Sequence, residues 1–116
     1  MALALIVTLH FVTAAYADCA VPKKPVPVPD GSSATAEEMN AAKTALDNFE
    51  IVVKQFQTCV EADTKSKSAA LGKNVEAIKR LRTMSEKRVN VFNDELQKQA
   101  DSYTEQMRTW KLTNRQ

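Results

Sequence analysis

The feature that most constrains this chain is an uninterrupted heptad pattern in its first half. Apolar residues recur at alternating spacings of three and four, at Met39, Ala42, Leu46, Phe49, Val53, Phe56 and Val60. A strand would place apolar residues at every second position, whereas this spacing is that of a helix packed along one seam. Thr35 and Glu38 form the capping-box pair that begins a helix. The pattern therefore predicts a long amphipathic helix that opens at Thr35.

A second apolar stripe follows the first. It comprises Leu71, Val75, Ile78, Leu81, Val89, Phe92, Leu96, Tyr103, Met107 and Trp110. Polar Ser85 and Gln99 interrupt this stripe. The chain has only two glycines and 6% aromatic residues, a composition that disfavours β-sheets. Two long helices with a short connection must lie antiparallel. We therefore predict an all-α fold, a coiled-coil-like antiparallel two-helix hairpin over residues 35–116, preceded by an extended Pro-rich N-terminal arm.

The position of the turn between the helices has two interpretations. We favour a turn at Gly72-Lys73, because Gly72 can take the left-handed conformation after a helix and Asn74 can cap the next one. The alternative places the turn at residues 64–68, which are rich in Thr, Ser and Lys, with Gly72 inside the second helix.

The first seventeen residues predict where the protein is located. They carry no charge, are nearly all apolar, and end in Ala15-Tyr16-Ala17, the small-x-small pattern that signal peptidase cleaves. We predict a signal peptide over residues 1–17 and an exported protein, periplasmic or secreted, after cleavage following Ala17. Seventeen apolar residues also lie at the lower limit of a membrane span, so an uncleaved anchor is the alternative.

Residues 18–34 form the predicted arm. Its four prolines, interleaved with valines, are typical of a polyproline II segment. Pro29-Asp30-Gly31 predicts a turn, in which Pro29 sets φ and Gly31 permits a positive φ.

The arm is long enough to connect the two cysteines of the chain. A helix from Thr35 to Cys59 is about 36 Å long, and the extended arm from Cys19 to Thr35 reaches up to about 50 Å. The arm can therefore turn back along the first helix and close a Cys19–Cys59 disulfide, worth about 2–4 kcal/mol. The alternative is an intermolecular bond in a dimer.

Charge is distributed unevenly between the helices. Residues 35–64 carry a formal charge of −4 and residues 73–88 one of +4. An acidic helix beside a basic one would favour antiparallel pairing. The alternative is an anionic-ligand site for lipid head groups or envelope polysaccharides. Its candidate residues are Lys79, Arg80, Arg82, Lys87 and Arg88. The net charge of +2 is too small to predict a nucleic-acid partner.

Several motifs together resemble a family of small, uncharacterised exported proteins of proteobacteria. They are Pro29-Asp30-Gly31-Ser32, Ala34-Thr35-Ala36-Glu37-Glu38-Met39, Cys59-Val60-Glu61-Ala62, Asn93-Asp94-Glu95-Leu96, Glu105-Gln106-Met107-Arg108 and Trp110-Lys111. The resemblance implies export and a helical hairpin with two cysteines, and it implies no activity.

The residue inventory disfavours catalysis. The only histidine, His10, lies in the leader, so the cleaved chain has no histidine for a Ser-His-Asp triad or for a histidine metal site. We predict no enzyme activity, metal or cofactor.

We instead expect a non-enzymatic structural or protein-interaction module of the cell envelope that acts with an unknown protein or self-associates as a homodimer. Trp110 is the candidate partner anchor. The alternatives are the anionic lipid or polysaccharide binder and a holdase-like periplasmic chaperone with an apolar groove between the helices.

Overall fold

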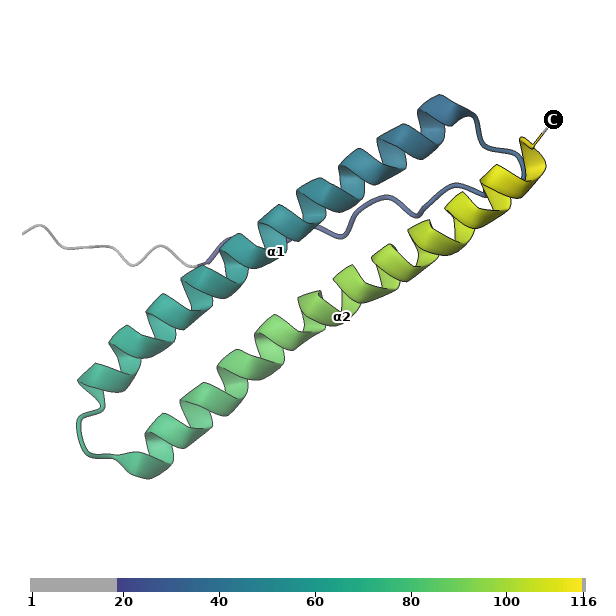
Figure 1. Cartoon of the computed structure of the whole chain (residues 1–116). Helices are drawn as coiled ribbons and strands as arrows, with labels where there is room; N and C mark the ends of the chain where they lie inside the picture. Colours follow the sequence, from purple (N-terminus) through teal and green to yellow (C-terminus); the bar gives the residue numbers. More distant parts are fainter. Residues whose placement is uncertain (1–18, 116) are drawn as a thin grey trace, which may run out of the picture.

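Two long helices and an extended arm make up the chain between residues 19 and 115, the part that the computed structural model describes. Helix α1 (Ala36–Ala70) and helix α2 (Val75–Thr113) lie antiparallel as a hairpin (Figure 1). At 1.5 Å per residue they are about 52 and 58 Å long. Residues 19–115 contain no strand. The predicted all-α hairpin is confirmed, whereas the predicted leader and its cleavage after Ala17 lie outside the described residues.

The capping box at the start of α1 forms as predicted. The Thr35 hydroxyl accepts a hydrogen bond from the Glu38 amide at 3.1 Å. The Glu38 carboxylate in turn accepts one from the Thr35 amide at 2.7 Å. Two amides that the first helical turn cannot pair are thereby satisfied, which fixes where α1 begins.

The turn between the helices lies where we favoured it. Gly72 has a φ of 61°, the left-handed conformation that glycine adopts without a steric penalty. Asn74 caps α2, because its side chain accepts a hydrogen bond from the Ala77 amide at 3.2 Å. Since α1 continues unbroken through residues 64–68, the alternative turn there is wrong. Leu71 consequently belongs to the turn and not to the apolar stripe of α2.

The heptad seam of α1 forms the core. Six of its seven members are buried: Met39, Leu46, Phe49, Val53, Phe56 and Val60. From α2, Val89 is the buried apolar residue, and Phe92 packs edge-on against Phe56 with ring centroids 5.0 Å apart. Burying one such side chain fully is worth about 1.5–3 kcal/mol. The seam of α1 is more deeply buried than that of α2.

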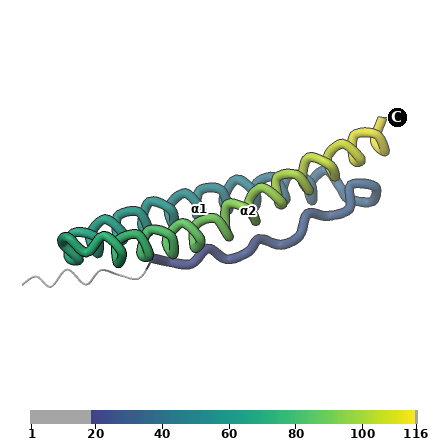
Figure 2. Tube along the Cα trace, turned by 90° about the horizontal axis from the view of Figure 1, so that it is seen from below, coloured from purple at the N-terminus to yellow at the C-terminus, as the bar shows by residue number. Residues whose placement is uncertain are grey.

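The arm adds to this core. From Cys19 the arm runs beside both helices, along one side of the hairpin, and then reverses direction in a turn at residues 30–34, where α1 follows (Figure 2). Pro22 of the arm is buried, and Val28 and Pro29 are half-buried. The arm is therefore a third packed element that covers one side of the seam between the helices.

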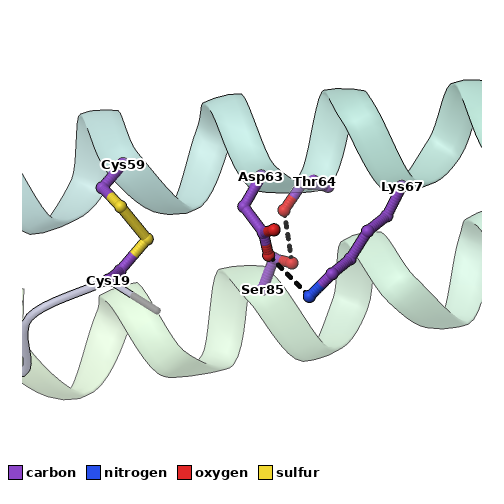
Figure 3. Close-up of a disulfide and its surroundings, with 6 residues drawn as sticks. All are labelled: Cys19, Cys59, Asp63, Thr64, Lys67 and Ser85. Atoms are coloured by element: carbon purple, nitrogen blue, oxygen red, sulfur yellow. Dashed lines mark hydrogen bonds and ion pairs between the residues drawn. A yellow bond between two sulfur atoms is a disulfide. The ribbon is translucent and has the colours of Figure 1, made fainter. Parts of the chain in front are cut away.

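The arm covers only part of the hairpin. It ends at the disulfide, and between Cys59 and the turn the described chain consists of the two helices alone (Figure 1). Here the hydroxyls of Thr64 and Ser85 lie 2.6 Å apart across the seam (Figure 3). Ser85 donates to the Leu81 carbonyl at 2.9 Å, so Thr64 is the donor to Ser85. We call this part of the hairpin, residues 60–88, the open half.

Neither helix within residues 19–115 has the length and apolar character that crossing a bilayer requires.

Candidate functional site

A disulfide attaches the start of the arm to the second half of α1. Cys19 and Cys59 are bonded, with their Cα atoms 5.7 Å apart (Figure 3). The predicted intramolecular pairing is thereby confirmed. Because the chain contains only two cysteines, this bond leaves none for the alternative intermolecular bridge.

Two glutamines of α2 hold the backbone of the arm. The side-chain amide of Gln99 donates to the Val26 carbonyl at 3.0 Å. The side-chain oxygen of Gln106 accepts from the Gly31 amide at 2.8 Å. Gln99 is only 8% exposed, so its hydrogen bond offsets the cost of burying an amide. Gln99 therefore does not merely interrupt the stripe of α2, because it is the polar contact that the arm requires.

Gly31 lies closer to α2 than any other residue type could. A Cβ atom at this position would be 2.0 Å from the carbonyl oxygen of Gln106 and 2.9 Å from the amide nitrogen of Trp110. The predicted turn near Gly31 is present, but the prediction that Gly31 is needed for a positive φ is wrong. Its φ is not positive, because Gly72 is the only described residue with a positive φ. Close backbone packing, and not backbone conformation, requires the glycine.

Asp30 stabilises the same turn. One of its carboxylate oxygens accepts hydrogen bonds from the Ser32 hydroxyl at 2.7 Å and from the Ser32 amide at 2.9 Å. These two bonds favour the charged form and lower the pKa of the Asp30 carboxyl below its ordinary value of 3.8.

Trp110, the candidate partner anchor, takes part in the attachment of the arm. Its indole N–H donates to the Ala34 carbonyl at 3.1 Å, and the residue is half-buried. The polar atom of the side chain is therefore occupied within the chain. A role of the remaining ring surface in partner binding stays a prediction.

The five basic candidate residues are all exposed on α2. Because an α-helix turns about 100° per residue, their spacing spreads them over about 240° of the helix circumference. Arg80 and Lys87 share one side, and Arg88 lies about 80° beyond Arg80. Arg82 lies on the other side, with Lys79 between it and Lys87. The five residues therefore do not form one compact basic face.

The charges of the two helices do not pair across the seam. Of the ion pairs within residues 19–115, three lie inside α1 and one joins Lys24 of the arm to Glu95 at 3.1 Å. Arg88 instead places its guanidinium 5.7 Å from the centre of the Phe56 ring, within the range of a cation–π contact. The acidic and basic helices are thus not joined by direct salt bridges in this part of the chain.

A groove of about 490 Å³ lies between the helices, mostly in the open half. The residues that line it are Gln57, Val60, Glu61, Thr64, Lys65 and Ser68 of α1, and Arg82, Ser85, Glu86, Val89, Asn90 and Asn93 of α2. Gln57 and Glu61 each lie two residues from Cys59, which places them about 200° around α1 from the disulfide. The groove therefore lies on the opposite side of the seam from the arm.

These contacts define a class of protein, a disulfide-clamped two-helix hairpin whose own N-terminal arm closes one side of the seam. Among residues 19–115, no three or more His, Cys, Asp or Glu residues are grouped so that they could hold a metal ion. No known protein family model, curated protein or solved structure matches the chain. The resemblance to the exported proteobacterial family therefore stays a prediction.

Sequence reasoning missed Gln99 and Gln106 as functional residues. A signal for them exists, because they are seven residues apart and so lie on the same side of α2 near its apolar stripe. Two amide side chains at such positions indicate a polar partner at the seam. That partner is the arm backbone.

Proposed function

We propose that this protein is an exported, non-enzymatic protein-interaction module of the cell envelope. The observation that carries the proposal is that the helix seam is covered unevenly. The arm, the disulfide and the two glutamines close one side of the seam as far as Cys59, whereas a groove lies on the opposite side, mainly beyond Cys59 where the arm does not reach. A disulfide persists in an oxidising compartment, which agrees with export. The clamp thus stiffens a hairpin that presents its uncovered side.

The lining of the groove indicates the chemistry of the partner. Val60 and Val89 are its apolar residues. Charged residues of both signs also line it: Glu61, Lys65, Arg82 and Glu86. A protein segment with a small apolar side and charges of both signs would complement this surface. With only two valines, the groove fits an unfolded client of a holdase poorly.

Site-specific photo-crosslinking in the producing cell tests the proposal. We would introduce the crosslinker at Asn90, which lines the groove, and at Gln55, an exposed residue of α1 outside it. We expect adducts of discrete mass from Asn90 and none of these from Gln55. An adduct of twice the chain mass would identify a second copy as the partner. No adduct, or the same adducts from both positions, would contradict the proposal.

A purified partner identified in this way allows a second test. The variant Lys65→Glu/Arg82→Glu reverses both basic groups that line the groove, so we expect at least a tenfold loss of affinity for a partner that pairs with them. The control Lys43→Glu/Lys54→Glu makes the same change of charge on exposed residues outside the groove. Equal losses in the two variants would argue against the groove as the binding surface.

A second candidate function is binding to anionic lipid or polysaccharide. The observation that favours it is that none of the five basic candidates of α2 is in an ion pair within residues 19–115. Exposed cations without partners attract anionic surfaces, and this attraction weakens as salt rises. Salt-dependent binding to anionic vesicles or to a sulfated polysaccharide would support this function, and binding to neither would rule it out.

A further inference from the structure

A stripe along α2 combines basic and exposed apolar side chains. It consists of Arg80, Met84, Lys87, Arg88 and Val91, and we call it the basic–apolar stripe. Its members follow one another at spacings that keep them within about 100° of the helix circumference. Met84 is 64% exposed and Val91 is 62% exposed. Two large apolar side chains are thus kept in solvent among three cations.

The stripe is separate from the surfaces already described. Val89 of α2 faces the core, and Arg82 faces the groove. Both lie outside the sector of the stripe. At one edge of the stripe, the contact of Arg88 with the Phe56 ring holds its guanidinium near the arm side of the seam. The stripe is therefore a third surface of the hairpin.

The charge of the stripe is not cancelled within the described chain. Arg80, Lys87 and Arg88 form no ion pair among residues 19–115. Two carboxylates follow within about one turn of Val91: Asp94, which is exposed, and Glu95, with which Lys24 of the arm pairs at 3.1 Å. The arm thus neutralises one of these two carboxylates. Arg80 and Lys87 remain without an ion-pair partner in the described chain, whereas Arg88 lies over the Phe56 ring.

We propose that the basic–apolar stripe binds the surface of an anionic phospholipid bilayer, with α2 lying parallel to the membrane plane. The cations contact lipid phosphates, while Met84 and Val91 enter the boundary between head groups and acyl chains. This inference rests on the second candidate function, the binding of an anionic ligand. It specifies which side of α2 binds and that the ligand is phospholipid. Phospholipid is favoured over polysaccharide because a bilayer offers an apolar phase to these two side chains and a hydrated polysaccharide does not.

The expected effects follow from the two kinds of side chain. A basic residue near an anionic membrane contributes about 1 kcal/mol, a factor of about five in affinity. Reversing two of them in Arg80→Glu/Lys87→Glu should therefore weaken binding by at least about 25-fold. Replacing the apolar pair in Met84→Ser/Val91→Ser should weaken vesicle binding by about tenfold. The apolar replacements should leave binding to a sulfated polysaccharide unchanged.

The matched control uses the same helix. The variant Lys79→Glu/Arg82→Glu makes the same change of net charge at two residues of α2 outside the stripe, of which Arg82 lines the groove. All these positions are exposed, so each variant should keep the fold. Circular dichroism and the intact mass of the oxidised chain verify this. Binding is measured by co-sedimentation with vesicles of phosphatidylglycerol and phosphatidylcholine, with phosphatidylcholine alone, and by retention on the polysaccharide.

The outcomes separate the inference from the function on which it rests. Binding to phosphatidylglycerol vesicles that is lost in Arg80→Glu/Lys87→Glu, kept in Lys79→Glu/Arg82→Glu and weakened in Met84→Ser/Val91→Ser supports the stripe. Equal losses in the two charge variants, or full binding without the apolar pair, overturn the stripe but keep anionic binding. Binding to polysaccharide alone overturns the lipid assignment. Binding to neither ligand overturns both.

Discussion

Replacing Gly31 with alanine sets a methyl group against the backbone of α2. The new carbon would lie 2.0 Å from the carbonyl oxygen of Gln106, where an ordinary contact begins at 3.4 Å. The arm must therefore move away by about 1.4 Å. A shift of this size breaks the hydrogen bond from the Gly31 amide to the Gln106 side chain, now 2.8 Å long.

The free energy of unfolding should fall by about 1.5–4.5 kcal/mol. Overpacking a well-packed contact costs about 1–3 kcal/mol, and the lost hydrogen bond adds about 0.5–1.5 kcal/mol. We would measure urea unfolding of the oxidised protein by circular dichroism and by the fluorescence of Trp110, the only tryptophan. The fluorescence also reports whether the arm end beside Trp110 stays docked. An unchanged or raised stability, as expected for an unstrained glycine-to-alanine change, would refute the packing argument.

Further variants distinguish packing from other causes. In the Gln106→Ala background, Gly31→Ala should still destabilise, because the clashing atom belongs to the backbone of residue 106. At Gly72, where φ is 61° and no atom lies within 4 Å of an added Cβ, alanine should cost about 1–2 kcal/mol through backbone strain alone. Asparagine tolerates that conformation and should recover most of the loss at Gly72. It should recover none at Gly31.

Three other expectations concern the arm. Removing the disulfide in Cys19→Ser/Cys59→Ser opens a loop with a sequence separation of 40. The free energy of unfolding, measured in urea, should fall by about 4 kcal/mol. An unchanged midpoint would mean that the bond does not constrain the unfolded chain. Trp110→Phe keeps an aromatic ring but removes the indole donor, so circular dichroism in urea should show a loss of about 1 kcal/mol, and a neutral result would mean that water replaces the bond. The hydrogen bonds from Ser32 lower the pKa of the Asp30 carboxyl in the folded state. The charged Asp30 carboxylate therefore stabilises the fold fully at a pH above its ordinary pKa of 3.8, and this stabilisation is lost as the pH falls through the pKa of the folded state. The stability difference between the wild type and Asp30→Asn should therefore shrink on acidification, and a constant difference would exclude Asp30 as its source.

The hairpin could be predicted from sequence because its signals are local. The heptad of α1 predicted which residues are buried, with Val53 only 1% exposed. The pair Thr35 and Glu38 gave the start of α1, and Gly72 gave its end. Each signal depends on residues within a few positions of one another, so helix geometry alone translates it into structure. Chain reach showed that the Cys19–Cys59 disulfide was possible, and the structure decides between it and the intermolecular bond.

The attachment of the arm could not be predicted in the same way. Gln99 and Gln106 pair with backbone groups 73 and 75 residues earlier in the chain. Backbone groups are present at every residue and leave no mark in the sequence. In the hydrophobic pattern alone, a glutamine at the seam therefore looks like a break in the apolar stripe. Likewise, only the packed structure shows that the backbone of α2 fills the space where Gly31 would carry a side chain.

The placement of the arm's partners also sets an order of events for a chain that emerges N-terminus first. Cys19 can meet Cys59 when less than two thirds of the sequence is available. Gln99, Gln106 and Trp110 arrive only near its end. Oxidation can thus tether the arm before its docking surface exists, and the tether shortens the later search because a closed loop confines the arm to α1. The disulfide would then act as a guide during assembly as well as a brace in the finished molecule.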